Sequence, residues 1–269
     1  MSAAGFSGQG RTTAKNVHEL AGQLGERDEK ILRDLARVRL LSGHQLDRLH
    51  FAALTPPHRA RSRVLKRLVA WRAVTTLSRR VGGVRAGSAG LIYTLDVAGQ
   101  RALQLLDRSD HGPARRPWTP GQMFTAHSLA VSELYVALRE AERRGELELL
   151  DLRAEPACWQ RTTTLGTLKP DAYVLVAHGE MEDAWWVEVD RSTESRATLR
   201  RKLELYLLAA QTGQVGPSGV LPRVLVTVPD EARLMQVRET VAAMPAAEKL
   251  ISVAQHDQAV PGIARVLRE

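Results

Sequence analysis

Apolar residues in the first part of the chain follow helical spacing first and strand alternation afterwards. One helical stripe covers 31–41, and shorter stripes follow at 46–49 and 64–69. Two strand-like runs then flank a glycine-rich connection, and a last helical segment closes the pattern; these three segments cover 73–80, 90–96 and 97–107. Three helices, a β-hairpin and a trailing helix form the element order of a winged helix-turn-helix.

The third predicted helix separates apolar from cationic side chains. Its apolar side, which includes Leu65 and Val69, is expected to face the core, and its other side carries Arg59, Arg63, Lys66 and Arg67. Further arginines lie in and beside the glycine-rich connection, namely Arg79, Arg80 and Arg85. Such a helix can place cations in the major groove, and the wing can approach the DNA backbone or minor groove. The alternative is that these arginines only solvate the surface of a module that binds protein.

Charge is divided unevenly along the chain. Residues 1–120 contain 21 Lys and Arg against 9 Asp and Glu, whereas residues 121–269 contain 17 against 21. A basic first part beside a slightly acidic second part indicates that the first part meets nucleic acid. Aromatic stacking platforms are missing from the first part, so double-stranded DNA is the favoured partner there.

A polar segment that contains Pro and Gly, 108–122, predicts a linker. A long amphipathic helix, three strand-like runs, a helix, a strand, another helix and a last strand follow it. The order is α-β-β-β-α-β with additions at the end. The sequence therefore predicts a two-domain α/β (α+β) protein with four segments: a flexible N-terminus at 1–25, a winged helix at 26–107, the linker at 108–122 and a second domain at 123–269.

Composition narrows the class of protein. The single cysteine, Cys158, excludes an intramolecular disulfide and a thiolate zinc site, and it fits a reducing compartment. No run approaches the roughly 20 apolar residues of a membrane span, and the N-terminus lacks the apolar region of a secretory signal. We therefore expect a cytoplasmic protein without a membrane partner.

Acidic residues interrupt two strand-like runs that otherwise read as buried. Strand alternation places Glu188 and Asp190 on one face with Trp186, and a hairpin would bring Asp171 of the preceding strand near them. Acids that converge in this way suit Mg²⁺ or Mn²⁺, which can polarise a phosphodiester and activate water. Simpler interpretations remain open: Asp171 as a strand-entry turn, Glu188 on an exposed face, and Asp190 as the cap of a helix that starts near 192–195.

The order and spacing of several short motifs resemble a known family. The segments "KPDAYV", "WWVEVDRSTES" and "KLELY" follow "AHSLAVSELYVAL" and the predicted winged helix. This layout resembles the replication-relaxation family of plasmid and mobile-element proteins, over roughly residues 26–230. Its second part is similar to the PD-(D/E)xK, or restriction-endonuclease-like, superfamily, which implies that core for the second domain.

The resemblance implies roles for individual residues. Asp171 and Glu188 match the two metal-binding acids of the superfamily, and Glu133 matches a helix glutamate that some members add to the site. Asp190 stands where the nuclease pattern expects a lysine, a group that positions water and stabilises developing charge. Lys202 on the following helix is the best candidate to replace it, one helical turn from Tyr206.

Two functions follow from this interpretation. In one, the protein is a non-catalytic DNA-binding factor in plasmid replication, relaxation or transfer, and its degenerate second domain serves a homodimer or recruitment. In the other, it is a Mg²⁺- or Mn²⁺-dependent endonuclease that hydrolyses duplex DNA. Asp190 in the lysine position favours the first function, and the presence of both Asp171 and Glu188 favours the second.

Overall fold

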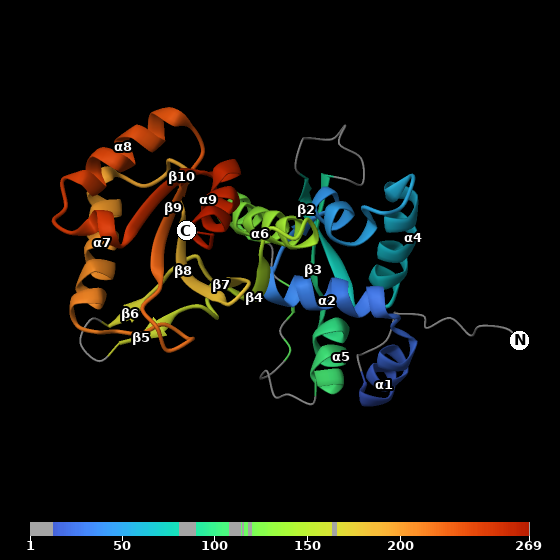
Figure 1. The fold of residues 1–269 in the computed structure, drawn as a ribbon. Helices are drawn as coiled ribbons and strands as arrows, with labels where there is room; N and C mark the ends of the chain where they lie inside the picture. The colour runs from blue at the N-terminus through green and yellow to red at the C-terminus, as the bar shows by residue number, and fades with distance from the viewer. Residues whose placement is uncertain are drawn as a thin grey trace, which may run out of the picture. The chain divides into compact units, whose positions relative to one another are not determined.

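The computed structural model describes residues 13–80, 90–107, 114, 116–117, 120–162 and 166–268. The chain divides into two compact units, Met1–Ser132 and Glu133–Glu269, and each combines helices with β-sheet (Figure 1). The mixed α/β class predicted from the sequence is thereby confirmed. The division falls inside one helix, α6 (Gln122–Arg143), whereas most of the predicted linker at 108–122 lies outside the described residues.

The first unit packs helices against a small antiparallel sheet. Its strands lie in the order β1-β3-β2, with Leu41 opposite Tyr93 and Val74 opposite Leu95. The elements are α1 (Ala14–Gln23), α2 (Glu26–Val38), β1 (Leu41–Ser42), α3 (Gly43–Leu46), the π-helix η1 (Asp47–Phe51), α4 (Pro57–Ala70), β2 (Val74–Arg80), β3 (Leu91–Leu95) and α5 (Val97–Asp107). The predicted succession of helices, two longer strands and a trailing helix is therefore present.

Polar side chains fix the turn that precedes α3. Ser42 and Gln45 form a reciprocal capping box: the Gln45 N–H donates to Ser42 Oγ over 3.2 Å, and the Ser42 N–H donates to Gln45 Oε1 over 2.9 Å. Gln45 Nε2 also donates to the Leu129 carbonyl, and Ser132 Oγ donates to the Leu40 carbonyl over 2.6 Å. These bonds hold the N-terminal half of α6, which belongs to the first unit, against the turn before α3.

Two expectations for this unit differ from the structure. The stretch 1–25 was expected to be flexible, but its part Ala14–Gln23 is helical and buries Val17 and Leu20, and residues 1–12 lie outside the described residues. Helix α4 buries Leu65 as expected, whereas Val69 is exposed. The inward positions of α4 are 61, 65 and 68, because these fall on one helical face and Arg61 joins the two leucines in the interior.

The second unit contains a five-stranded mixed sheet with the order β10-β9-β8-β7-β4. Strands β4, β7 and β8 form an antiparallel meander, and β9 and β10 run parallel to β8. The elements are β4 (Glu148–Ala154), β5 (Gln160–Arg161), β6 (Thr167–Leu168), β7 (Ala172–His178), β8 (Met181–Val189), α7 (Arg196–Gln211), β9 (Arg223–Val228), α8 (Glu231–Ala242), η3 (Ala247–Lys249), β10 (Ile251–Gln255), η4 (His256–Gln258) and α9 (Ala259–Val266).

Helices α7 and α8 cover one face of this sheet (Figure 1). Trp186 of β8 lies in the same buried cluster as Leu203 and Tyr206 of α7 and Val237 of α8. The period of 2 along the strands and of 3.6 along the helices accounts for this packing, since each element turns one apolar face to the other layer. The position of Glu188 on the face of Trp186 therefore directs its carboxyl group toward α7 and not toward solvent.

Some elements of the second unit have no counterpart in the sequence prediction. The two-stranded sheet of β5 and β6 pairs Gln160 with Leu168, and α9 follows the last strand. In the described part of the chain, no helix has the length and apolar character needed to cross a membrane.

Candidate functional site

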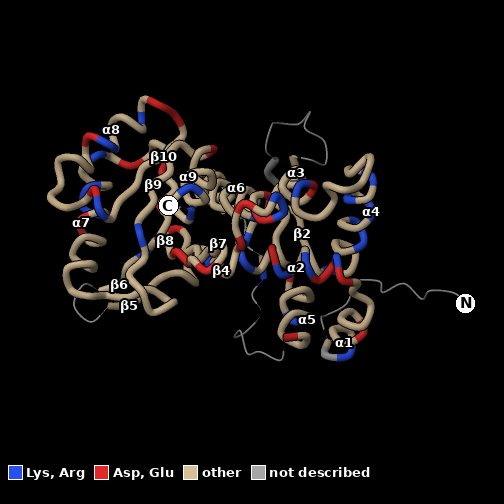
Figure 2. The backbone as a smooth tube through the Cα atoms, viewed as in Figure 1, with Lys and Arg blue, Asp and Glu red and all other residues tan. Residues whose placement is uncertain are grey.

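The first candidate surface is the cationic face of α4, defined as Arg59, Arg63 and Lys66. These residues stand four and three positions apart, so they share one side of the helix, and all three are exposed. Figure 2 shows Lys and Arg spaced along α4. Within the described residues, none of the three forms an ion pair, so each cation remains available to a partner.

Arg67 was predicted to belong to this surface, but it has partners within the unit. Its guanidinium donates to both carboxylate oxygens of Asp28 on α2, over 2.6 Å each, and lies 5.0 Å from the ring centroid of Trp71. Asp28 is 3% exposed and also accepts a hydrogen bond from the Gly25 N–H. Arg67 therefore holds α4 against α2.

Arg61 has a similar role on the buried side of α4. It is 1% exposed, pairs with Asp47 of η1 and donates to the Gly43 carbonyl over 3.0 Å. Burial lowers the pKa of Arg61 from its ordinary value. The contacts tie α4 to the preceding helical turn, so they fix the angle at which the cationic face is presented.

The other predicted DNA contacts cannot be placed. Arg79 and Arg80 lie in β2, but the described residues include only their backbone. Arg85 lies outside the described residues altogether. The wing contacts therefore stay predictions.

The second candidate site is a buried group that we call the acid–lysine cluster: Asp171, Glu188, Lys202 and Tyr206. Glu188 of β8 is 2% exposed. Lys202 Nζ forms an ion pair with Glu188 Oε2, and Tyr206 Oη donates to Glu188 Oε1, with both groups supplied by α7. Lys202 and Tyr206, one helical turn apart, therefore face the sheet together.

Asp171 joins the cluster from the neighbouring strand. It stands directly before β7, and its N–H donates to the Val187 carbonyl over 3.0 Å. Its Oδ2 accepts from the Val189 N–H over 2.7 Å, so Asp171 bonds to the two residues of β8 that flank Glu188. The predicted convergence of two acids from adjacent strands is therefore present, with an ammonium group beside them.

Burial controls the protonation of this cluster. It raises the pKa of Glu188 to about 8; the Asp171 carboxylate adds to the rise, and the Lys202 ammonium acts against it. Burial lowers the pKa of Lys202, but attraction to the two carboxylates outweighs it, so the net shift is upward. Burial also raises the pKa of Tyr206. Glu188 consequently holds its proton more tightly than a solvated glutamate does.

Asp190 has a different partner. Its Oδ2 accepts from Arg233 Nε of α8 over 2.6 Å, and its Oδ1 accepts from the Ser192 N–H over 2.7 Å. Arg233 also donates to the Glu194 carbonyl over 2.9 Å. The cap of α7 is Ser195, not Asp190, since Ser195 Oγ accepts from the Thr198 N–H. Asp190 thus stabilises the turn between β8 and α7 and anchors α8 to it.

The side chains as they stand do not fit a divalent cation. Both oxygens of Glu188 are engaged by Lys202 and Tyr206, and Asp190 is bonded to Arg233. Glu133, the third predicted ligand, is exposed on α6. The described residues contain no group of three or more His, Cys, Asp or Glu side chains that could hold a metal ion. The cation beside these acids is the Lys202 ammonium, which pairs with Glu188, and we derive no metal-dependent step from the cluster.

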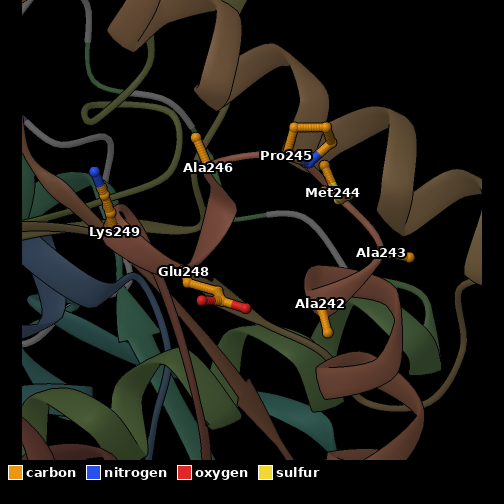
Figure 3. A pocket seen from close by; sticks show the side chains of 7 residues that line it. All are labelled: Ala242, Ala243, Met244, Pro245, Ala246, Glu248 and Lys249. Atoms are coloured by element: carbon orange, nitrogen blue, oxygen red, sulfur yellow. The ribbon is translucent and has the colours of Figure 1, made fainter.

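A separate pocket of about 350 Å³ lies after the C-terminal end of α8 (Figure 3). Its lining is mostly small, and its two charged residues are Glu248 and Lys249. No residue of the acid–lysine cluster lines it. The pocket is therefore not part of either candidate site.

Comparison with known proteins gives one match. The family model described as replication-relaxation matches residues 32–224, which is well over half of the 269 residues. The matched range begins in α2 and ends in β9, so it includes both the cationic face and the acid–lysine cluster. No curated protein and no solved structure matches the chain. The chain belongs to the replication-relaxation family.

Proposed function

We propose that this protein binds double-stranded DNA through the cationic face of α4. One observation carries the proposal: Arg59, Arg63 and Lys66 share one side of an exposed helix and have no ion pair among the described residues. Exposed Lys and Arg side chains suit phosphate contacts, because they replace the counterions condensed on DNA and release them. The capping box at Ser42 and the Arg61–Asp47 pair support the same function, since they hold the helix in a fixed orientation.

The arrangement of elements around α4 agrees with a winged helix. A short strand precedes α3, and β2 and β3 follow α4 in a sheet of order β1-β3-β2. In that fold the helix before the hairpin enters the major groove. We infer that α4 is the recognition helix and that the family name, replication-relaxation, refers to DNA on which the protein acts, plasmid or mobile-element DNA being the favoured source.

Arg63→Ala combined with Lys66→Ala is expected to weaken binding to a labelled duplex by about tenfold or more at moderate salt. Each lost phosphate contact should also flatten the plot of log K against log salt by about 0.9. The measurement is fluorescence anisotropy over a salt series. The control is Lys15→Ala with Lys30→Ala, which removes the same charge from exposed positions on α1 and α2. Equal affinity and slope in the two double variants would assign α4 to protein contacts.

For the second unit we propose a restriction-endonuclease-like core that no longer cleaves. The antiparallel meander β4–β7–β8, the helix α7 and the parallel strand β9 support that core. Asp190 stands in the position of the nuclease lysine and is bonded to Arg233. Since Glu188 pairs with Lys202 and Asp190 with Arg233, the unit is suited to recruitment or to a homodimer on DNA.

A second function, DNA cleavage, is favoured by one observation: α7 supplies a lysine to Glu188 of β8, and Asp171, which precedes β7, bonds to the next residue of β8. We expect no nicking of supercoiled plasmid by the purified protein with Mg²⁺ or Mn²⁺. Gel analysis of plasmid topology measures this, with Asp171→Asn and Glu188→Gln as near-isosteric controls. Nicking by the parent protein that both substitutions abolish would establish the nuclease and reverse our assignment.

A further inference from the structure

The second unit exposes a tryptophan beside the acid–lysine cluster. Trp159 is 41% exposed, whereas Trp185 and Trp186 are 1% and 0% exposed, and Trp71 is partly buried. Trp159 is therefore the most exposed tryptophan among the described residues. An exposed tryptophan ring offers a flat apolar surface on which a partner's ring can stack.

Two short segments hold this tryptophan in place. On one side of it, Cys158 is buried and its Sγ lies 3.0 Å from the Pro170 carbonyl. On the other side, Gln160 of β5 pairs with Leu168 of β6. The tryptophan is thus framed by paired backbone, and its ring is presented from a preorganised position.

Two cations accompany the ring. Lys169 Nζ lies 4.9 Å from the ring centroid of Trp159, and Arg161 follows in β5. Both side chains are exposed, and neither has an ion pair with another described residue. An exposed ring with unpaired cations fits a partner that is aromatic and anionic at once.

We propose that Trp159, Arg161 and Lys169, which we call the Trp159 platform, bind a single DNA strand. An unpaired base stacks on the exposed surface of the ring, and Arg161 and Lys169 contact the flanking phosphates. Lys169 is separated from Asp171 only by Pro170, so the bound strand lies beside the acid–lysine cluster. The inference rests on the proposed action on DNA, but it assigns the single strand to the second unit and the duplex to α4.

This division has a physical reason. Within a duplex the bases are stacked on each other and cannot reach an aromatic ring, whereas an opened strand offers its bases at no unpairing cost. A protein that holds a duplex through one unit and an unpaired strand through the other would favour locally opened DNA.

The test measures the affinity for a labelled oligothymidylate by fluorescence anisotropy. To silence α4, every variant carries Arg63→Ala with Lys66→Ala. Trp159→Ala is expected to weaken binding by about tenfold or more, and Trp159→Phe is expected to keep most of the affinity, since stacking survives. Arg161→Ala with Lys169→Ala should reduce the salt slope by about 1.4, at 0.7 for each lost contact on a single strand. Met181→Ala is the control, because Met181 is 61% exposed and lies in the β7–β8 hairpin.

The outcomes separate the two proposals. If Trp159→Ala and Met181→Ala bind the oligonucleotide equally well, the platform is not a base-binding site. If the wild-type protein binds duplex but no oligonucleotide, the proposal for the platform is wrong and the proposed function of α4 is retained. If the wild-type protein binds neither, both proposals are wrong. A change in sedimentation caused by Trp159→Ala, with unchanged affinity, would make the platform a protein interface and overturn the inference.

Discussion

Arg233→Met is expected to lower the free energy of unfolding of the second unit by about 3–5 kcal/mol, because it leaves a buried carboxylate without its cation. The side chains of Arg233 and Asp190 are 9% and 3% exposed, and 2.6 Å separates the guanidinium Nε from Oδ2. The substitution also removes the donor to the Glu194 carbonyl. Among the described residues, the hydrogen bond from the Ser192 N–H is the one that then remains for Asp190.

Urea unfolding followed by tryptophan fluorescence measures this loss, since Trp185 and Trp186 are buried in the second unit. The double variant Asp190→Asn with Arg233→Met should recover most of the stability, because a neutral pair carries no unmatched charge. Arg196→Met is the matched control: its ion pair with Glu239 is exposed, and we expect a cost below about 1 kcal/mol. If Arg233→Met lowers the free energy of unfolding no more than this control does, the Asp190–Arg233 pair does not stabilise the unit. The presence of Asp190 where the nuclease pattern expects a lysine then needs another explanation.

Much of the fold can be predicted because each element buries one face. The meander of the second unit and the helix α7 appear in the sequence as periods of 2 and 3.6, and the same periods turn Glu188 of the sheet and Lys202 of the helix toward each other. The contact between these two residues therefore follows from the two periods. The sequence predicted Lys202 beside the acids as well as a divalent ion between them, and in the structure Lys202 pairs directly with Glu188.

Contacts between distant elements were not predictable. Arg233 lies 43 residues after Asp190, and no local pattern links a strand-end acid to an arginine on α8. Arg61 and Arg67 show the same limit on α4, where amphipathic spacing alone assigns arginines to solvent. Each instead meets an acid from another element, and the sequence shows only that both charges exist.

For helix α1, the sequence contained an indication of the structure, but the surrounding residues favoured a different prediction. Helix α1 places Val17, Leu20 and Leu24 at helical spacing, but the Gly, Ser and Thr around them favoured a flexible start. Trp159 follows the buried Cys158 and precedes a strand of only two residues. Such a short element has no period to detect, so the exposure of its tryptophan is a property of the tertiary structure.

Glu188→Gln is expected to remove a pH dependence from the free energy of unfolding of the wild-type protein. Glu188 ionises near 4.5 in a solvated chain and near 8 in the folded protein. Between these values the folded state binds more protons than the unfolded state, so the stability contributed by Glu188 falls as the pH rises. One proton sets the limit of this slope at about 1.4 kcal/mol per pH unit. Glutamine keeps one oxygen as an acceptor at this position but has no ionisable proton.

The difference in unfolding free energy between Glu188→Gln and wild type isolates this group. His256 contributes with the opposite sign, because burial lowers its pKa and stability then rises with pH, but it is present in both proteins. The difference should therefore shift in favour of the glutamine variant from pH 5 to pH 8, measured by urea unfolding at each pH. Glu182→Gln, at an exposed position on the same strand, is the control. A difference that stays constant across this range would mean that Glu188 is ionised throughout, held by Lys202 as a fixed ion pair, and that its burial does not govern its charge.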